Sequence, residues 1–396
     1  MKKQLPHLSV LVLFLISVNA LAQSDFRNGY IINMENDTIQ GLVDYRSNSK
    51  NYESCIFKGE QVETVYFPNQ ILGFGYINDR YYSSQIIEGS FVEVLVTGDI
   101  NLFKSKNKYH VQKDTSLYHL ESKIEVVEIE SKKVKKETSR WRGILAFLIS
   151  DCFQDFNSLT SDIKLNDRGL TQLIVKYNRC RGNNFVEYKA NKPWTRFEWG
   201  AAFGLSRSEI TITKGLGNYS YLANSYSSID PTLGAVIVLS SPRILESIAF
   251  QGEFQIARPS YSSLVVINGT TTEYHDTFID LTTISIPLSL KYSFPEKKYG
   301  WNIQGGINYD YHLKSDARLK SESVSGNVVN TYPESSAFEV NENQIGYWGG
   351  IGITRPYNKF TVGFSIRYFQ MSTLNKVWGF GADNNKISIN LILLRR

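Results

Sequence analysis

A strict two-residue alternation of apolar and polar side chains governs the second half of this 396-residue chain, from about Trp194 to Arg396. In its first segment the apolar residues are Phe197, Trp199, Ala201, Phe203 and Leu205, and the residues between them are charged or small. Successive side chains of a β-strand point to opposite faces, so a period of two predicts strands. The fold of this half must therefore give one face of each strand an apolar environment and the other face a polar one.

The pattern recurs often enough to predict eight strands. The further segments are residues 233–240, 248–255, 284–292, 301–311, 345–354, 360–368 and 387–394. Runs of ten residues or more are long for soluble sheets, whose strands average about five or six residues, but they suit tilted membrane strands. Aromatic residues gather at the ends of the apolar rows, for example Trp301 and Tyr311, as is typical of the two interfaces of a membrane.

The connections between these segments alternate in length. Short turns are expected at residues 242–243, 295–298 and 355–358, and long polar loops at residues 206–230, 258–277, 312–343 and 371–385. Alternating short turns and long loops are the plan of outer-membrane barrels. We therefore predict a mainly β protein with an eight-stranded antiparallel transmembrane β-barrel over residues 193–396. The alternative is a soluble β-sandwich, which also alternates an apolar with a polar face.

The first residues predict export. Lys2 and Lys3 precede an apolar run over residues 8–18 and the triplet Ala20-Leu21-Ala22, which is the pattern of a cleaved signal peptide over residues 1–22. No cysteine follows the expected cleavage site, so we expect no lipid anchor. Eight strands leave both ends of the barrel on the short-turn side. This predicts the outer membrane for the barrel and the periplasm for the preceding domain.

That preceding part is predicted to contain a small periplasmic β-domain over residues 23–137 and a short helical linker segment over residues 138–182. A hairpin around residues 35–37 opens the β-domain. The helices follow from apolar residues at three- and four-residue spacing and from a cap at Asn166. The lysine-rich residues 132–136 predict a solvated linker, and loss of Lys2 and Lys3 lowers the formal net charge from +5 to +3, so no nucleic acid partner is expected.

Three cysteines remain to be paired. An oxidising periplasm favours one disulfide, and Cys152 and Cys180, near the ends of the two predicted helices, are the expected pair. Cys55 is then free. No histidine or second cysteine lies at ligand spacing, so neither a metal nor another cofactor is expected.

Charged residues also fall on the face that is predicted to line the barrel. They are Glu198, Glu253, Lys291, Asp310 and Arg367. An eight-stranded barrel has little more room than its own side chains need, so we predict a charge network that fills the interior. A path for protons or a ligand is the alternative.

The chain resembles the PorT-like outer-membrane β-barrel proteins of Bacteroidota, the "outer membrane protein beta-barrel domain" type. Residues 279–292, with the sequence IDLTTISIPLSLKY, match the middle strand of that family. The N-terminal part resembles a recurrent Bacteroidota module through residues 29–32, 36–41, 151–152 and 177–180. Together these cover nearly the whole mature chain. The resemblance implies the fold, and a role in envelope organisation or secretion.

We therefore expect a non-catalytic protein that contacts outer-membrane lipid, anchors a periplasmic domain and exposes loops to an unknown protein or surface partner. Two alternatives stay open. One is a lipid-acting barrel enzyme that uses His275 or His312 as its base. The nucleophile of such an enzyme would have to lie within hydrogen-bond reach of that histidine. The other is a small passive channel or ligand carrier.

Overall fold

The computed structural model describes residues 25–395, except residues 61, 107, 123, 130–131, 138–139, 154, 214–218, 295–298 and 377–379. This part of the chain is mainly β and divides into two compact units, of which unit 1 ends at Lys192 and unit 2 begins at Pro193. The expected signal peptide lies outside the described residues. Within the described ranges, no helix is long and apolar enough to span a bilayer.

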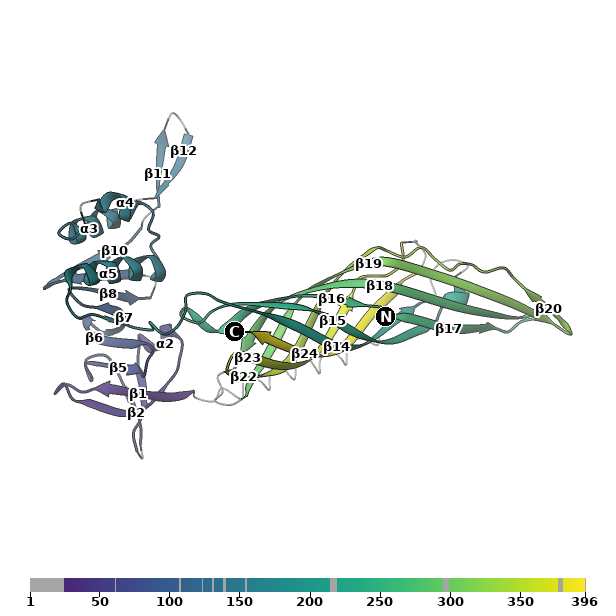
Figure 1. Cartoon of the computed structure of the whole chain (residues 1–396), viewed down its shortest axis with the longest axis horizontal. Helices are drawn as coiled ribbons and strands as arrows, with labels where there is room; N and C mark the ends of the chain where they lie inside the picture. Colours follow the sequence, from purple (N-terminus) through teal and green to yellow (C-terminus); the bar gives the residue numbers. More distant parts are fainter. Residues whose placement is uncertain are drawn as a thin grey trace. The chain divides into compact units, whose positions relative to one another are not determined.

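Unit 1 is built on one eleven-stranded antiparallel sheet with the order β10-β9-β8-β7-β6-β5-β1-β2-β3-β4, in which β13 also pairs with β7 (Figure 1). The strands are β1 Phe26–Ile32, β2 Thr38–Asp44, β3 Cys55–Lys58, β4 Glu63–Tyr66, β5 Gly73–Tyr76, β6 Tyr81–Ile87, β7 Ser90–Thr97, β8 Ile100–Ser105, β9 Lys108–Lys113, β10 Ser116–Leu120 and β13 Val186–Glu187. The expected hairpin is present, because β1 pairs with β2 around a turn in which Asn36 adopts a φ of 69°, a left-handed conformation that asparagine tolerates.

Helices cover part of this sheet. They are α2 Asn48–Asn51, α3 Arg140–Ile149, α4 Phe156–Ser161 and α5 Asp167–Arg181. The predicted cap is present, since the Asn166 side chain accepts a hydrogen bond of 2.8 Å from the Gly169 amide. The segment that we expected to be a linker lies instead within unit 1, because α3 and α5 bury Trp141 and Leu173 in one core with Val111 of β9. Amphipathic helices gain most of their stability from such packing.

The lysine-rich residues 132–136, which we expected to form a solvated linker, are part of a strand. They belong to β12 Lys132–Glu137, which pairs with β11 Ile124–Ile129 in a separate two-stranded sheet. The backbone register runs from Ile124 opposite Glu137 to Ile129 opposite Lys132.

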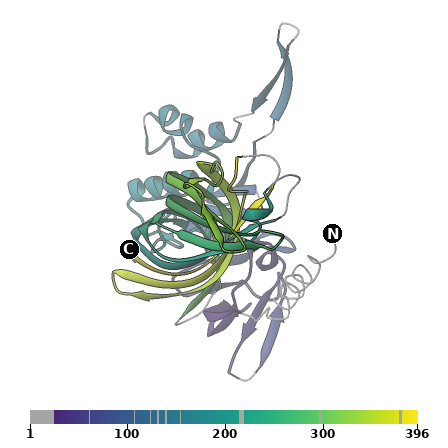
Figure 2. The ribbon, with the colours of Figure 1, turned by 90° about the vertical axis from the view of Figure 1, so that its right-hand side faces the viewer.

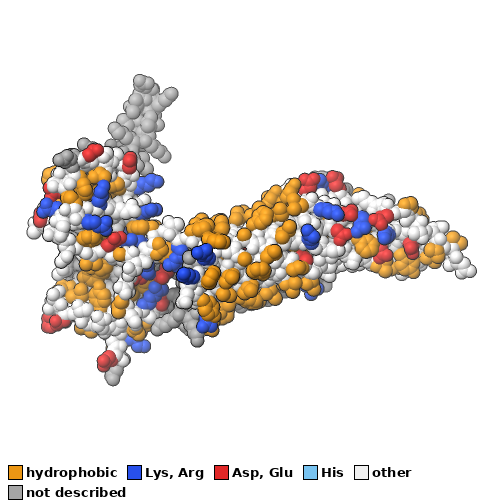
Figure 3. Space-filling model, viewed as in Figure 1, with side chains coloured by type: hydrophobic (Ala, Val, Ile, Leu, Met, Phe, Trp, Pro, Cys, Tyr) orange, Lys and Arg blue, Asp and Glu red, His pale blue; other side chains and the backbone are white. Residues whose placement is uncertain are grey.

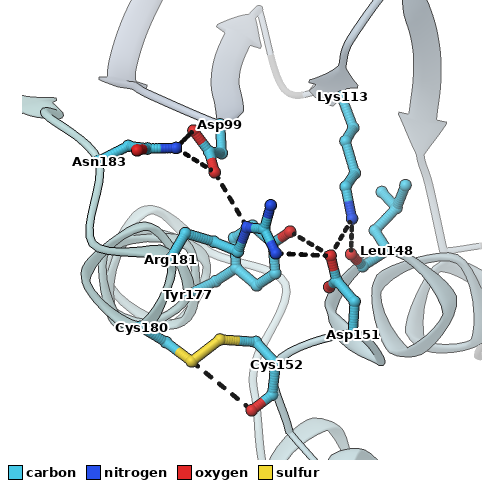
Figure 4. Close-up of a disulfide and its surroundings, with 9 residues drawn as sticks. All are labelled: Asp99, Lys113, Leu148, Asp151, Cys152, Tyr177, Cys180, Arg181 and Asn183. Carbon is cyan, nitrogen blue, oxygen red and sulfur yellow. Dashed lines mark hydrogen bonds and ion pairs between the residues drawn. A yellow bond between two sulfur atoms is a disulfide. The ribbon is translucent and has the colours of Figure 1, made fainter.

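The predicted disulfide between Cys152 and Cys180 is confirmed, and Cys55 is a free, buried cysteine. Figure 4 shows the disulfide beside Asp151, whose carboxylate accepts hydrogen bonds from Lys113 Nζ at 3.1 Å and Tyr177 Oη at 3.0 Å. Burial opposes ionisation of Asp151, but these bonds outweigh it and the pKa of Asp151 is lowered. The disulfide and this acceptor together fasten α5 and the segment after α3 to β9.

In unit 2, eight antiparallel strands pair edge to edge and the last pairs with the first. Figure 2 views unit 2 roughly along these strands. These strands, which we call the ring, are β14 Arg196–Ile212, β15 Ser225–Ser241, β16 Leu245–Ala257, β18 Thr272–Ser293, β19 Gly300–Ser325, β22 Asn343–Tyr357, β23 Phe360–Met371 and β24 Ala382–Arg395. The shorter elements are the 3-10 turn Ser220–Leu222, β17 Ser260–Ile267, β20 Val328–Thr331 and β21 Ser335–Ser336. Along the stretch where a ring strand is paired on both sides, both of its backbone edges are hydrogen-bonded to neighbouring strands.

The strands run well into the segments that we expected to be long loops. β14 continues to Ile212, β19 reaches Ser325, and β24 begins at Ala382 instead of at residue 387. Beyond Leu205 the two faces of β14 exchange character, since Arg207 and Glu209 point outward while Ile210 and Ile212 are buried inside. These segments are polar outside and apolar inside, so their sequences read as loops although they are sheet.

The buried side chains of this part form a second core, which we call the distal core. It contains Ile210, Ile212, Leu222, Tyr226, Tyr261, Ile279, Leu281, Ala317, Leu319, Ala337, Phe338, Val340, Leu374, Phe380 and Ala382. A bulge marks its boundary on β19, where Thr283 pairs with His312 and Thr282 with Lys314, so that Leu313 is an extra residue. Because of this extra residue, even-numbered residues such as His312 point inward before the bulge, whereas odd-numbered residues such as Ala317 and Leu319 point inward after it.

We predict that replacing both Cys152 and Cys180 by serine lowers the free energy of unfolding of unit 1 by about 3 to 4 kcal/mol, because the bond closes a 28-residue separation in the unfolded chain. Hydrogen exchange of the α5 amides in the full chain measures the loss. Reductant should reproduce it in the native chain and have no effect on the double variant. Equal exchange in the two proteins would contradict the prediction.

Candidate functional site

The interior of the ring, which we call the lumen, carries the strongest concentration of buried charge in unit 2. At its centre Arg367 of β23 faces Glu253 of β16, with Nη2 to Oε1 at 2.7 Å and Nη1 to Oε2 at 3.0 Å. Arg367 is 1% exposed. Gln251 and Gln255 each donate a further hydrogen bond to the Glu253 carboxylate. This two-pronged pair satisfies both buried charges, which isolated would be costly in the interior.

Glycine makes room for this arginine. A Cβ on Gly350 of β22 would lie 2.9 Å from Cγ of Arg367 and 2.6 Å from the Ile366 carbonyl oxygen. The guanidinium also lies 4.8 Å above the ring of Trp348 on the same strand. Trp348 and Gly350 lie two residues apart on the same face of β22, so that one strand provides both the space and a cation-π surface.

Lys291 and Glu198 complete the proximal half of the lumen, toward the turns at residues 242–243 and 355–358. Lys291 is buried on β18, and the negative charges of Glu198 on β14 and of Glu253 act on it attractively. The four residues carry two positive and two negative charges. This part of the network is therefore balanced within itself.

Asp310 belongs to a different group. Its partners are Asn308 at 2.7 Å, the Ser285 hydroxyl and Lys386 at 3.6 Å, and no described contact joins it to Glu253 or Arg367. Lys386 was not among the predicted lumen residues, because we expected the last strand to begin at residue 387, whereas β24 begins at Ala382. Continuing the two-residue period from Asn390 back to Ser388 would have assigned Lys386 to the lumen.

Apolar side chains close much of the lumen as well. Its proximal part holds Ala202, Val236, Val238, Ile392 and Leu394, and the distal core fills its other end. Between them a cavity of about 30 Å³ lies beside Asp230, Asp310 and Lys386. The lumen is therefore packed by two apolar clusters in addition to the expected charges.

Both candidate histidines make polar contacts. His312 lies 2.8 Å from the Thr283 hydroxyl and 3.2 Å from Gln344 Oε1, inside the lumen. His275 lies on the distal part of β18, with Nδ1 at 2.9 Å from Ser321 Oγ and Nε2 at 3.2 Å from Glu273 Oε2. His275 and Ser321 are cross-strand partners, so this row follows from the register of β18 and β19.

A larger cavity, of about 470 Å³, opens on the distal surface of unit 2. Its charged lining residues are Asp316, Arg318, Glu334, Glu339, Glu342 and Lys376. Arg318 pairs with Asp316 at 3.1 Å, and Lys376 pairs with Glu339 at 3.3 Å. Within the described ranges, no three histidine, cysteine, aspartate or glutamate side chains converge as a metal site.

Unit 1 contains a histidine pair that the sequence did not reveal. His110 of β9 and His119 of β10 are cross-strand partners, and their Nδ1 atoms lie 2.6 Å apart. His110 is buried. Burial, followed by the positive charges of His119 and Lys108, lowers the pKa of His110 from 6.5 to about 4.

No model of a known protein family matches this sequence, and no protein with curated annotation matches it. Among solved structures the chain is similar to Neisserial surface protein A (NspA), with 11% identity and a TM-score of 0.26 over 50% of this chain and 97% of that one. The chain is also similar to the attachment invasion locus protein Ail of Yersinia pestis, with 12% identity and a TM-score of 0.23 over 50% of this chain and 97% of that one.

The outer membrane protein OprG from Pseudomonas aeruginosa gives 10% identity and a TM-score of 0.27 over 51% of this chain and 94% of that one. Likenesses at these identities and scores establish neither a family nor a function.

We predict that Glu253→Gln destabilises unit 2 by about 3 to 5 kcal/mol, because it leaves the buried Arg367 charge without its counter-charge. Unfolding of the full chain in detergent, followed by gel migration, measures the effect. The double variant Glu253→Gln with Arg367→Met should recover part of the loss, since it removes both charges. A double variant less stable than Glu253→Gln would contradict this.

We further predict that unit 1 loses stability as the pH falls from about 6.5 to about 4. The unfolded chain takes up a proton on His110 near its ordinary pKa of 6.5, whereas the folded chain resists protonation down to about 4. Hydrogen exchange of the β9 and β10 amides across this range measures the slope. His110→Gln should flatten it, and an unchanged slope in that variant would refute the assignment.

Proposed function

We propose that unit 2 is an eight-stranded transmembrane β-barrel of the outer membrane that anchors unit 1 in the periplasm and presents its distal surface to a partner. In this proposal the protein is not an enzyme, and its work is to hold and expose surfaces. The observation that carries it is a belt of exposed apolar side chains around the whole ring.

The belt includes every strand of the ring. Two outward side chains from each strand illustrate it: Phe203, Leu205, Leu233, Ile237, Phe250, Phe254, Leu290, Tyr292, Ile303, Ile307, Ile345, Ile351, Phe364, Ile366, Leu391 and Leu393. Ile307 is 59% exposed and Leu290 64%. Figure 3 shows the hydrophobic side chains covering one face of the ring, with charged side chains gathered on the distal section beyond it. Soluble proteins rarely expose apolar patches larger than a few hundred Å².

The height of the belt fits a bilayer. On β19 it extends from Trp301 to Tyr311, which is about 33 Å along the strand at about 3.3 Å per residue. A strand tilt of about 40° reduces this to about 25 Å, the height of the apolar band of outer-membrane barrels. Aromatic residues stand at both of these ends, as at membrane interfaces.

The inversion beyond the belt supports the same reading. In the distal section many outward side chains are polar, with exposed apolar exceptions such as Ile229 and Leu264, and the inward ones form the distal core, the order expected in water. The belt has the opposite order, with Asn308 and Asp310 inside and Ile307 and Tyr309 outside. A soluble sandwich would need the apolar faces between two sheets, whereas these faces are exposed on a closed ring.

The packed lumen argues against a passive channel. The Glu253 and Arg367 pair crosses it, and apolar clusters lie on either side. The distal surface, with its cavity of about 470 Å³ among acids and bases, is the part suited to meeting a protein or surface partner. An enzymatic alternative would rest on His275 between Ser321 and Glu273. Its test is whether His275→Ala abolishes a lipid change while the barrel stays folded.

We also propose that the chain belongs with the PorT-like Bacteroidota proteins and serves envelope organisation or secretion. Support comes from the resemblance of residues 279–292. They form the part of β18 that pairs with β19 along its whole length and crosses from the distal core to the belt.

We predict that the native chain fractionates with outer membranes and migrates faster on gels before boiling than after it, because folded barrels resist detergent. Leu391→Arg, which places a charge in the middle of the belt, should cost about 2 to 4 kcal/mol of barrel stability. Asp383→Arg is the matched control, since it introduces the same residue on the outward face of the same strand beyond the belt, and it should be tolerated.

A native chain recovered in the soluble fraction would contradict the membrane location. Equal tolerance of Leu391→Arg and Asp383→Arg would show that the belt does not face hydrocarbon.

A further inference from the structure

The charges of the lumen divide into two groups, and only one is balanced. The proximal group has two acids, Glu198 and Glu253, and two bases, Lys291 and Arg367. The distal group has Asp230 and Asp310 with Lys386 as the base. The distal group therefore carries a net charge of −1 when its histidine is neutral.

The hydrogen bonds of that histidine fit the neutral form. Gln344 donates through Nε2 to the Ser372 carbonyl, so its Oε1 is an acceptor and His312 Nε2 donates to it. His312 Nδ1 can then accept the proton of the Thr283 hydroxyl. Both ring nitrogens are satisfied without a second proton on the ring.

The cavity of about 30 Å³ lies among these residues. Its lining is rich in oxygen, with the carboxylates of Asp230 and Asp310 and the hydroxyls of Ser206, Ser208, Thr232, Thr283 and Ser285. A space of about 10 to 15 Å³ already accepts one particle of the size of water. Lys386, also in the lining, lies 3.6 Å from Asp310.

Two side chains that line the cavity have polar atoms without a protein partner. Ser206 is 1% exposed and its Oγ makes no hydrogen bond, and Asn384 is 6% exposed and its Oδ1 accepts none. The amide nitrogen of the same Asn384 side chain is bonded, since Nδ2 donates to Gln344 Oε1 at 3.1 Å, and Asn308 beside Asp310 has a further buried oxygen, Oδ1, without a protein partner. Buried oxygens left in this way are costly unless something at the site binds them.

We propose that this cavity is a binding site for a small monovalent cation, held by the Asp230 and Asp310 carboxylates together with the Ser206 and Asn384 oxygens. A water molecule would meet the hydrogen-bonding need but would leave the charge of −1 buried. A hard monovalent cation meets both needs, since oxygen atoms are its preferred ligands and its charge balances the group. A divalent ion would leave an excess positive charge beside Lys386.

The test compares sodium with a cation too large for the cavity. The full chain is folded in a non-ionic detergent, and its unfolding is followed in sodium chloride and in choline chloride at equal ionic strength. A site with a dissociation constant of about 1 mM shifts the unfolding equilibrium toward the folded state about 100-fold at 100 mM sodium. Sodium-23 NMR relaxation of the same samples reports the bound ion directly.

Three variants locate the effect. Asp230→Asn makes the group neutral and should abolish the difference between the two salts. Ser206→Ala removes one oxygen without changing the charge, and it should weaken sodium binding several-fold even if Asp230→Asn fails to fold. Asp383→Asn removes an acid from the outward face of β24, next to Asn384, and should keep the full sodium effect.

Equal stability of the native chain in the two salts would overturn the proposal, and would show that a proton on His312 or on a carboxyl group balances the charge. A sodium effect that persists unchanged in Asp230→Asn and Ser206→Ala would also overturn it, because the ion would then bind elsewhere. Neither result depends on where unit 2 resides in the cell.

Discussion

The pairing of β24 with β14 is the constraint on which the rest of unit 2 depends. It joins the end of the chain to the start of the sheet, so the ring strands need no partner outside the ring for their backbone groups. A ring of eight strands encloses little more than its own side chains. The inward residues must therefore fit one another across the lumen, and Gly350 opposite Arg367 is one result. The outward residues are free of this limit and can match whatever surrounds the ring.

A single strand in this ring passes through two environments. The backbone of β14 alternates its side chains throughout, but the apolar side chains point outward up to Leu205 and inward after Arg207. The alternation is a property of the extended chain, whereas its sign depends on which side excludes water. In the distal section the apolar side chains are removed from water only when they point into the distal core. Along the belt they are exposed, and the proposed hydrocarbon surroundings resolve what would be a heavy cost in water.

Unit 1 is stabilised differently. Its sheet and helices share ordinary buried cores, and the disulfide between Cys152 and Cys180 fastens α5 to the segment after α3. The residues just before Lys192 are also tied in, since Val186–Glu187 pairs with β7 and Lys189 forms an ion pair with the buried Glu93 at 2.5 Å. Unit 1 can therefore keep its fold up to the point where unit 2 begins, which suits a domain held by an anchor.

The sequence by itself determined what depends on near neighbours along the chain: the strand period after Trp194, the Asn166 cap, and the inward face that holds Glu253 and Arg367. Only the tertiary structure decided which residues meet, because the partners lie far apart and their register is set by the closure of the ring. Asp310 thus faces Lys386 instead of joining Glu253. The His110 and His119 pair, the packing of the helices on the sheet and the inverted distal section were hidden for the same reason. A local pattern fixes which way a side chain points, but not what it points at.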